Sequence, residues 1–248
     1  LTQVAVGALR AGEAVWSVTC EVTLYALAAR LAAAMTGLTK QEVKVDPGRT
    51  VRLVRAWRQT GGEFLVEYHP GATVDWMASR LRGLEAEGRR IGLVVVDYLD
   101  LMKAGRTYGD EGRRHELAEI CRDLRALGVE ANVPIWTAKG VNRKAVSKAV
   151  VTKADLSECF DVAYIADNIF ARCATDGERR RTEPGPDGRG EVRAPIVRLF
   201  YAAGREAEDE YTVAAFRRDN ARQRWVELPG YGLPGKDAAD GRAVSGGA

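Results

Sequence analysis

The sequence is poor in the residues that build zinc sites and disulfide frameworks. It has two histidines and four cysteines in 248 residues, and no two cysteines form a CxxC pair. Structural zinc sites and disulfide-rich secreted folds need such residues at close spacing. Both classes are therefore excluded, and the cysteines are expected to be reduced thiols in a cytoplasmic protein.

Long apolar runs and a strong net charge are also absent. No stretch of 18 apolar residues occurs and no signal peptide is visible, so no membrane span is expected. The 37 basic and 34 acidic residues leave a net charge of +3, so any nucleic-acid binding must come from local clustering. The length suffices for one large α/β domain, expected over residues 1–228. Residues 229–248 lack apolar periodicity and are expected to be a disordered tail.

In the stretch Ile91–Met102 (IGLVVVDYLDLM), five apolar residues precede Asp97, and the last three of them are valines. So apolar a run is typical of a strand buried on both faces, as in a parallel sheet covered by helices. Asp97 stands where this strand should end. Ligands of open α/β sheets bind at that edge, and Mg²⁺ carried by a nucleotide takes carboxylate and phosphate oxygens. From the strand alone, a metal ligand and a plain strand-ending aspartate are equally good interpretations.

Strands and helices alternate along the first two thirds of the chain, which predicts a mostly parallel α/β sheet flanked by helices. The expected strands are residues 14–20, 63–68, 91–97 and 135–138, and the expected helices are residues 1–11, 23–35, 50–59, 73–87 and 115–131. Residues 103–112 and 179–190 are rich in glycine and polar residues and are expected to be loops. Strand-like runs at 194–201, 211–216 and 224–228 predict a C-terminal antiparallel extension.

Several motifs in this order resemble the replicative DNA helicases of the DnaB type, which have a RecA-like P-loop NTPase core. VVVDYLDLM is similar to the Walker B strand of that family, and VTCEV to the strand that ends in its catalytic glutamate. The resemblance implies that Asp97 is the Mg²⁺ carboxylate and that Glu21 activates the attacking water. ATP and Mg²⁺ are the implied cofactors. Adjacent strand ends suit this chemistry, because NTP hydrolysis needs a metal carboxylate beside a water-orienting base.

The same resemblance implies contacts with DNA and with other subunits. Residues 139–153, here called the basic segment, are similar to the DNA-side loop of the family. Its five cations are the implied ligands of single-stranded DNA: Lys139, Arg143, Lys144, Lys148 and Lys153. Arg205 matches the arginine that reaches the neighbouring subunit's nucleotide. The implied assembly is a homo-oligomer, a hexameric ring of bacterial or phage type, with primase or a helicase loader as partners.

Three departures from the family pattern stand beside the resemblance. The phosphate-binding loop G-x-x-x-x-G-K-[ST] and the strand before it do not precede the Leu1 helix, so this stretch is expected to hydrolyse ATP poorly alone. Gly140 stands where related enzymes carry a glutamine that senses the γ-phosphate, with Lys139 as the neighbouring substitute. Ala203 stands where they carry the lysine of a Lys-x-Arg pair. The segment GYGLPGKD at 230–237 only imitates a phosphate-binding loop, since no apolar helix follows it.

Two other interpretations stay open on sequence grounds. Another RecA-like ATPase, such as a recombinase paralogue or a KaiC-type protein, would share Glu21 and Asp97 without unwinding DNA. A degenerate, non-catalytic DNA-binding module would account for Gly140 and Ala203.

Overall fold

The protein is described by a computed structural model, which places residues 1–59, 61–109, 112–142, 145–146, 148–151, 155, 162–184, 190–204, 213–229 and 231. The chain divides into two compact units. The first contains residues 1–140 and 220–224, and the second contains residues 141–219 and 225–248. Of the predicted tail, only Pro229 and Tyr231 are described, so the boundary at residue 228 stays a prediction.

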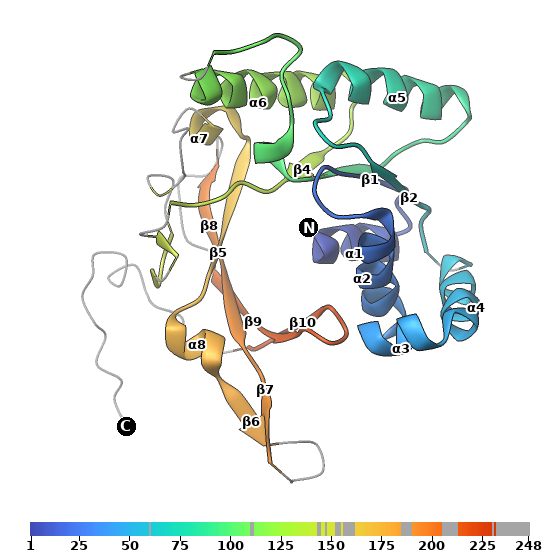
Figure 1. The fold of residues 1–248 in the computed structure, drawn as a ribbon, viewed down its shortest axis with the longest axis vertical. Helices are drawn as coiled ribbons and strands as arrows, with labels where there is room; N and C mark the ends of the chain where they lie inside the picture. Colours follow the sequence, from blue (N-terminus) through green and yellow to red (C-terminus); the bar gives the residue numbers. More distant parts are fainter. Residues whose placement is uncertain are drawn as a thin grey trace. The chain divides into compact units, whose positions relative to one another are not determined.

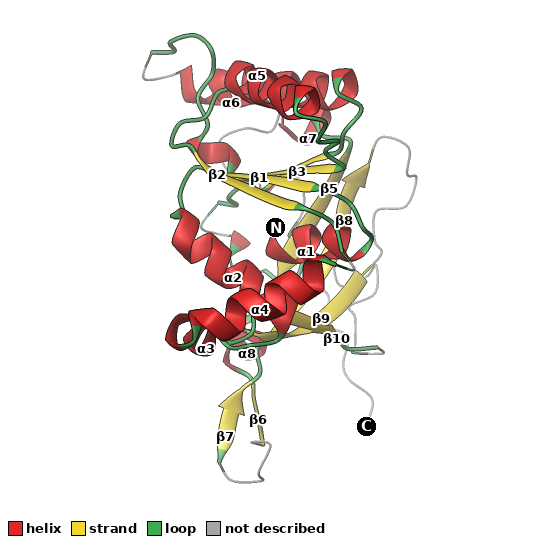
Figure 2. Cartoon of the chain, turned by 90° about the vertical axis from the view of Figure 1, so that its right-hand side faces the viewer, coloured by secondary structure: helices red, strands yellow, loops and turns green. Residues whose placement is uncertain are grey.

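The first unit is built on a four-stranded parallel sheet in the order β2-β1-β3-β4. Figure 1 labels β2, β1 and β4, and Figure 2 labels β3 beside β1. Its strands are β1 (Val15–Thr19), β2 (Phe64–Tyr68), β3 (Leu93–Asp97) and β4 (Ile135–Thr137). All of β1 and the first four residues of β3 are buried. The valine run therefore forms the interior strand that its composition predicts.

Helices cover both faces of this sheet. They are α1 (Thr2–Arg10), α2 (Leu24–Thr36), α3 (Lys40–Val45), α4 (Pro47–Arg58), α5 (Val74–Ala86) and α6 (Arg113–Glu130), with a 3₁₀ turn η1 (Leu99–Leu101) after β3. Helices α1 and α2 lie on one face, and α5 and α6 lie on the other (Figure 2). Leu9, Leu31 and Val95 share the core on the first face. None of the described helices is long and apolar enough to cross a membrane.

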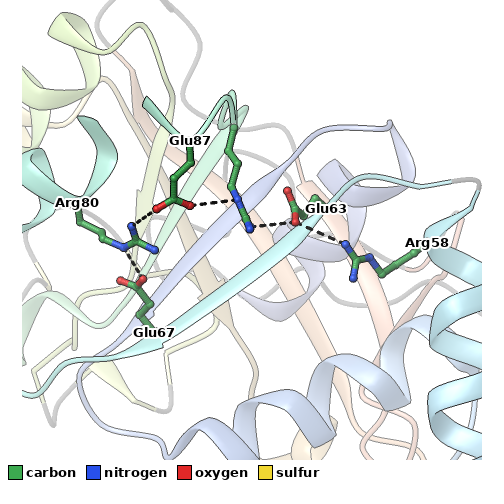
Figure 3. Close-up of polar contacts among 6 residues, drawn as sticks. Arg58, Glu63, Glu67, Arg80 and Glu87 are labelled. Atoms are coloured by element: carbon green, nitrogen blue, oxygen red, sulfur yellow. Dashed lines mark hydrogen bonds and ion pairs between the residues drawn. The ribbon is translucent and has the colours of Figure 1, made fainter. Parts of the chain in front are cut away.

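Charged side chains lie along β2, which is the end strand of this sheet among the residues that the structure describes. Figure 3 shows the resulting chain of ion pairs. Its members are Arg58, Glu63, Arg89, Glu87, Arg80 and Glu67. Charged residues along an edge strand oppose pairing with another chain, so this edge is protected from edge-to-edge association.

The second unit contains the predicted antiparallel extension, a sheet in the order β10-β9-β8-β5. Its strands are β5 (Asn168–Cys173), β8 (Ile196–Gly204), β9 (Val213–Asp219) and β10 (Arg224–Glu227). Ala145 and Val151 pack with Phe200 of β8 in the core of this unit. The predicted fold class, a parallel sheet flanked by helices with a C-terminal antiparallel sheet, is confirmed.

The prediction of a plain loop over residues 179–190 is wrong in its first part. Residues 179–180 close helix α8 (Asp176–Arg180), and β6 (Thr182–Pro184) pairs with β7 (Glu191–Arg193) as a hairpin. Proline and glycine between two short strands are as typical of a hairpin as of an irregular loop. A short helix, α7 (Val162–Ile165), precedes β5.

Candidate functional site

The carboxyl ends of β1 and β3 meet at one edge of the parallel sheet. In the register of this pair, Thr19 lies opposite Asp97, and the Cys20 amide donates a 2.7 Å hydrogen bond to the Asp97 carbonyl oxygen. Glu21 follows directly and is exposed, whereas Asp97 is partly buried. Two carboxylates separated by 76 positions in the sequence are thus carried by adjoining strand ends.

The turn that carries Glu21 is held at both ends. The Thr19 hydroxyl accepts a 3.0 Å hydrogen bond from the Val22 amide and donates one of 2.9 Å to the Val22 carbonyl oxygen. Thr23 then caps α2, its hydroxyl accepting from the Ala26 amide. A hydroxyl in the N-cap position satisfies one of the unpaired amides of the first helical turn. Glu21 therefore occupies a short, fixed link between a buried strand and a capped helix.

Negative charge gathers around Tyr98, the residue after Asp97. Burial raises the pKa of the Tyr98 hydroxyl, and the carboxylates of Glu21, Asp100 and Asp97 raise it further. The peptide bond between Asp97 and Tyr98 is cis. The effect on one phenol places these three carboxylates in the same neighbourhood, at the edge where ligands of such sheets bind.

The thiol beside this edge is unsuited to nucleophilic chemistry. Burial raises the pKa of Cys20, and the Asp97 carboxylate adds to the rise against a hydrogen bond with the Ala72 backbone. Reactive cysteines need a lowered pKa. The chemistry of this edge therefore belongs to its carboxylates.

The donors at this edge fit a magnesium ion that arrives with a nucleotide. Among the described residues, no three His, Cys, Asp or Glu side chains converge to hold a metal by themselves. Nucleotide-bound Mg²⁺ needs less, since one or two carboxylates and the phosphates complete its octahedral shell with water. Asp97 supplies a partly buried carboxylate for that role.

The end of β4 brings a cation to the same side of the sheet. The Lys139 ammonium is paired with the carboxylate of Asp100 in η1, and the Lys139 side chain is only 7% exposed. The other oxygen of Asp100 accepts a 3.2 Å hydrogen bond from the Gly140 amide. The Leu99 amide also donates to the Ala138 carbonyl oxygen at 3.1 Å. The residues that follow β3 and β4 are thus joined by three polar contacts.

The other members of the basic segment are only partly described. Lys148 is exposed and pairs with the buried Asp155 at 2.6 Å. Arg143, Lys144 and Lys153 lie outside the described residues, as does Arg205. Ala203, the departure next to Arg205, lies on β8 opposite Ile169 of β5. The proposed roles of all these residues remain predictions.

The structure adds three residues to the carboxyl edge that the sequence did not single out for function. Asp100 and Tyr98 stand in the DYLDLM stretch, directly beside Asp97, so their neighbourhood was visible in the sequence. His69 follows β2, and its ring stacks on Trp76 with centroids 4.0 Å apart. Only the sheet order reveals that His69 belongs to this edge, where its backbone amide donates a 3.0 Å hydrogen bond to the Thr19 carbonyl oxygen.

Comparison with known proteins supplies a family. The sequence profile of the DnaB-like helicase C-terminal domain matches residues 2–182. A replicative DNA helicase of Rhodothermus marinus is 34% identical over 110 residues, which are 44% of this chain and 12% of that protein. A replicative DNA helicase of a Nostoc species is 43% identical over 75 residues, 30% of this chain and 8% of the relative. The chain thus aligns with only a small part of these relatives.

Solved structures agree on the fold. An ATPase domain superimposes with a TM-score of 0.72 and 18% identity, over 92% of this chain and 80% of the other. A DnaB-like replicative helicase, solved to show its interactions with primase, gives a TM-score of 0.68 at 18% identity. That match covers 87% of this chain and 52% of the other. At such identities these matches establish the arrangement of helices and strands.

Proposed function

Because the chain belongs to the family of DnaB-like helicase C-terminal domains, we propose that it works as the ATP-hydrolysing motor domain of a replicative DNA helicase. The observation that carries the proposal is the meeting of Glu21 and Asp97 at adjoining strand ends of a parallel sheet. In this proposal the protein couples NTP hydrolysis to movement along single-stranded DNA as a hexameric ring. ATP and Mg²⁺ are its cofactors, and the bacterial or phage cytoplasm is its site of action.

The roles of the two carboxylates follow from their surroundings. Asp97, partly buried at the end of β3, would hold the metal ion that accompanies a nucleotide. Glu21 is exposed on a fixed turn, so it is placed to orient a water molecule and accept its proton. When bound, the magnesium nucleotide supplies the phosphoryl group and the metal charge, and Arg205 is the proposed finger toward a neighbouring subunit.

The basic segment is the proposed contact with DNA. Lysine and arginine side chains bind the phosphate backbone without regard to base sequence, as a motor that moves along a strand requires. The exposed Lys148 is ready for this role after leaving Asp155, whereas Lys139 is buried against Asp100. Primase or a helicase loader is the proposed protein partner of the whole assembly.

The test is ATP hydrolysis by the full-length protein with and without single-stranded DNA, measured beside Glu21→Gln in the same full-length background. The variant keeps size and polarity but cannot take a proton, so the DNA-stimulated rate should fall about 10²- to 10⁴-fold. Glu85→Gln changes an exposed glutamate of α5 and should leave the rate unchanged. Equal rates for wild type and Glu21→Gln would refute the assignment of Glu21.

Gly140 favours a second candidate, a DNA-binding module without ATPase activity. Its position follows β4 at the ligand edge, where a glycine has no side chain to contact a phosphate. DNA binding without ATP hydrolysis by the wild-type protein would support this module over the motor. The recombinase and KaiC-type alternatives are disfavoured by the helicase family match.

A further inference from the structure

The pair formed by Asp100 and Lys139 ties the metal edge of the sheet to the start of the basic segment. The two residues are 39 positions apart and meet because β3 and β4 are neighbouring parallel strands. Asp100 uses both carboxylate oxygens here, one for the Lys139 ammonium and one for the Gly140 amide. Its own carbonyl oxygen accepts a 2.5 Å hydrogen bond from Arg113 of α6, which anchors the turn that presents it.

Asp100 and Lys139 form a largely buried ion pair rather than an exposed surface contact. The side chains of Lys139 and Asp100 are 7% and 23% exposed. A buried ammonium needs a compensating anion, because its desolvation is costly when it is unpaired. Lys139 therefore stays with Asp100 until another anion takes its place.

A phosphate of DNA is such an anion. The basic segment begins at Lys139, so a strand bound along it brings phosphates to the point where Asp100 holds the ammonium. Asp100 and the phosphate then compete for one charge. Lys148 and Asp155 repeat the arrangement within the basic segment, with the lysine 48% exposed and the aspartate 7% exposed.

We propose that Asp100 is a positioning residue that holds Lys139 away from DNA in the free protein and releases it when a strand binds. DNA binding then changes the balance of charge at the end of β3. This inference rests on the proposed DNA contacts of the basic segment. When Lys139 moves to a phosphate, Asp100 loses its ammonium partner beside Tyr98, where the carboxylates of Glu21 and Asp97 already gather. By linkage, a cation that binds beside Asp97 and attracts Asp100 must strengthen DNA binding by the same factor that DNA strengthens cation binding.

The experiment is a fluorescence anisotropy titration of dye-labelled oligothymidylate with the whole chain, at several salt concentrations and without divalent ions. Asp100→Asn keeps the shape of the side chain but removes its charge, so the Lys139 ammonium loses this carboxylate partner. Affinity at low salt should rise about three- to tenfold. Because Lys139 contacts a phosphate in both complexes, the plot of log affinity against log salt should keep its wild-type slope.

Two controls separate release of Lys139 from a general loss of negative charge. In Asp100→Asn combined with Lys139→Gln, the gain in affinity should disappear, and the salt slope should be shallower than that of the wild type by about 0.7 because one phosphate contact is lost. Asp75→Asn removes one exposed carboxylate of α5 in the same unit and should bind as the wild type does. Asp100→Ser carries the same expectation as Asp100→Asn and replaces it if that variant does not fold.

The outcomes are distinct. An unchanged affinity for folded Asp100→Asn, or a gain that survives in the double variant, overturns the inference. An equal gain in Asp75→Asn also overturns it, because the effect is then general electrostatics. Wild-type protein that binds no oligothymidylate at any salt concentration overturns the proposed DNA contacts themselves. Those contacts survive if Lys148→Gln weakens binding while Asp100→Asn has no effect.

Discussion

Asp97 is the residue to which the proposed function assigns the metal of the nucleotide. It ends the buried β3 strand and lies opposite Thr19, two positions before Glu21. We expect Asp97→Asn to abolish the Mg²⁺ dependence of nucleotide binding, because an amide is a poorer metal ligand than a carboxylate. The measurement is the affinity for a fluorescent ATP analogue with magnesium and with a chelator. Asp75→Asn should retain the full magnesium effect, and a magnesium effect that persists in Asp97→Asn would contradict the assignment.

Lys148 is the described member of the basic segment whose side chain lies in solvent. We expect Lys148→Gln to weaken binding of oligothymidylate a few-fold at low salt and to flatten the salt slope by about 0.7, the share of one phosphate on a single strand. Lys44→Gln, an exposed lysine of α3, should leave both quantities unchanged. Loss of affinity with an unchanged salt slope would show that Lys148 acts through folding rather than through a phosphate contact.

For single residues, the sequence predicted the place in the fold better than the side-chain partners and burial. The valine run and its terminal carboxylate sufficed to place Asp97 at the end of a buried strand, and VTCEV placed Glu21 one step beyond another. The pairing of Lys139 with Asp100 could not be predicted from the sequence. That contact depends on β3 and β4 being neighbours and on side-chain burial, neither of which is encoded within either local stretch.

Elements of the first unit are tied together by charged side chains along the β2 edge. Arg80 of α5 contacts Glu67 of β2 at 2.6 Å and Glu87 at 3.2 Å (Figure 3). Both Arg80 and Glu67 are about one-third exposed or less, so solvent screening reduces the effect of the pair. We expect Arg80→Met to lower the free energy of unfolding by about 0.5–1 kcal/mol, measured by urea denaturation.

The same helix offers the control for this edge. Arg82 is 63% exposed and lies 4.0 Å from Glu130, so Arg82→Met should change the free energy of unfolding by less than about 0.5 kcal/mol. Equal losses in the two variants would show that arginine packing on α5, rather than the ion pairs at the edge, carries the effect.

Glu116, in the first turn of α6, is expected to make the free energy of unfolding depend on pH. Burial alone would raise the pKa of Glu116, but hydrogen bonds from Arg113 and the Ala104 amide outweigh it and lower the pKa. A lowered pKa adds stability that is present above the ordinary value of 4.5 and is lost as pH falls through the folded pKa. Glu116→Gln should therefore destabilise the protein by about 1–2 kcal/mol at neutral pH and flatten the pH dependence of unfolding below 4.5. Thermal melts across pH 3–7 would check both effects.

Helix α3 and strand β5 were not predicted, because their sequences lack a long apolar run or a clear periodicity. Helix α3 has six residues and little periodicity, although Thr39 and Glu42 form the capping box that its TKQE spelling allows. Strand β5 alternates exposed and buried residues beside a β-bulge. It is recognisable only once β8 supplies its partner. Short elements of this kind are stabilised by tertiary contacts more than by local propensity.

At the scale of the whole molecule, one short segment late in the sequence belongs to the first unit although the residues on both sides of it belong to the second. Residues 220–224, the turn between β9 and β10, belong to the first unit although both strands belong mainly to the second. Arg224 donates hydrogen bonds to the carbonyl oxygens of Ala34 and Met35 at 3.0 and 3.3 Å. It thereby satisfies the end of α2, the helix that begins just after Glu21. No local sequence pattern predicts this contact between Arg224 and Ala34, which are 190 positions apart.

Arg224 is therefore expected to stabilise α2 rather than the sheet in which it lies. A helix end leaves its last carbonyl oxygens unpaired, and a guanidinium there supplies both hydrogen bonds and a charge that suits the helix dipole. Arg224→Met should lower the free energy of unfolding of the first unit by about 1–2 kcal/mol. Hydrogen exchange should quicken at the last turn of α2 and leave the β5–β8 amides unchanged. Arg217→Met removes an exposed arginine paired with Glu183 in the second unit, and should leave exchange in α2 unchanged. Faster exchange across β5 and β8 in Arg224→Met would instead mean that the turn supports the antiparallel sheet.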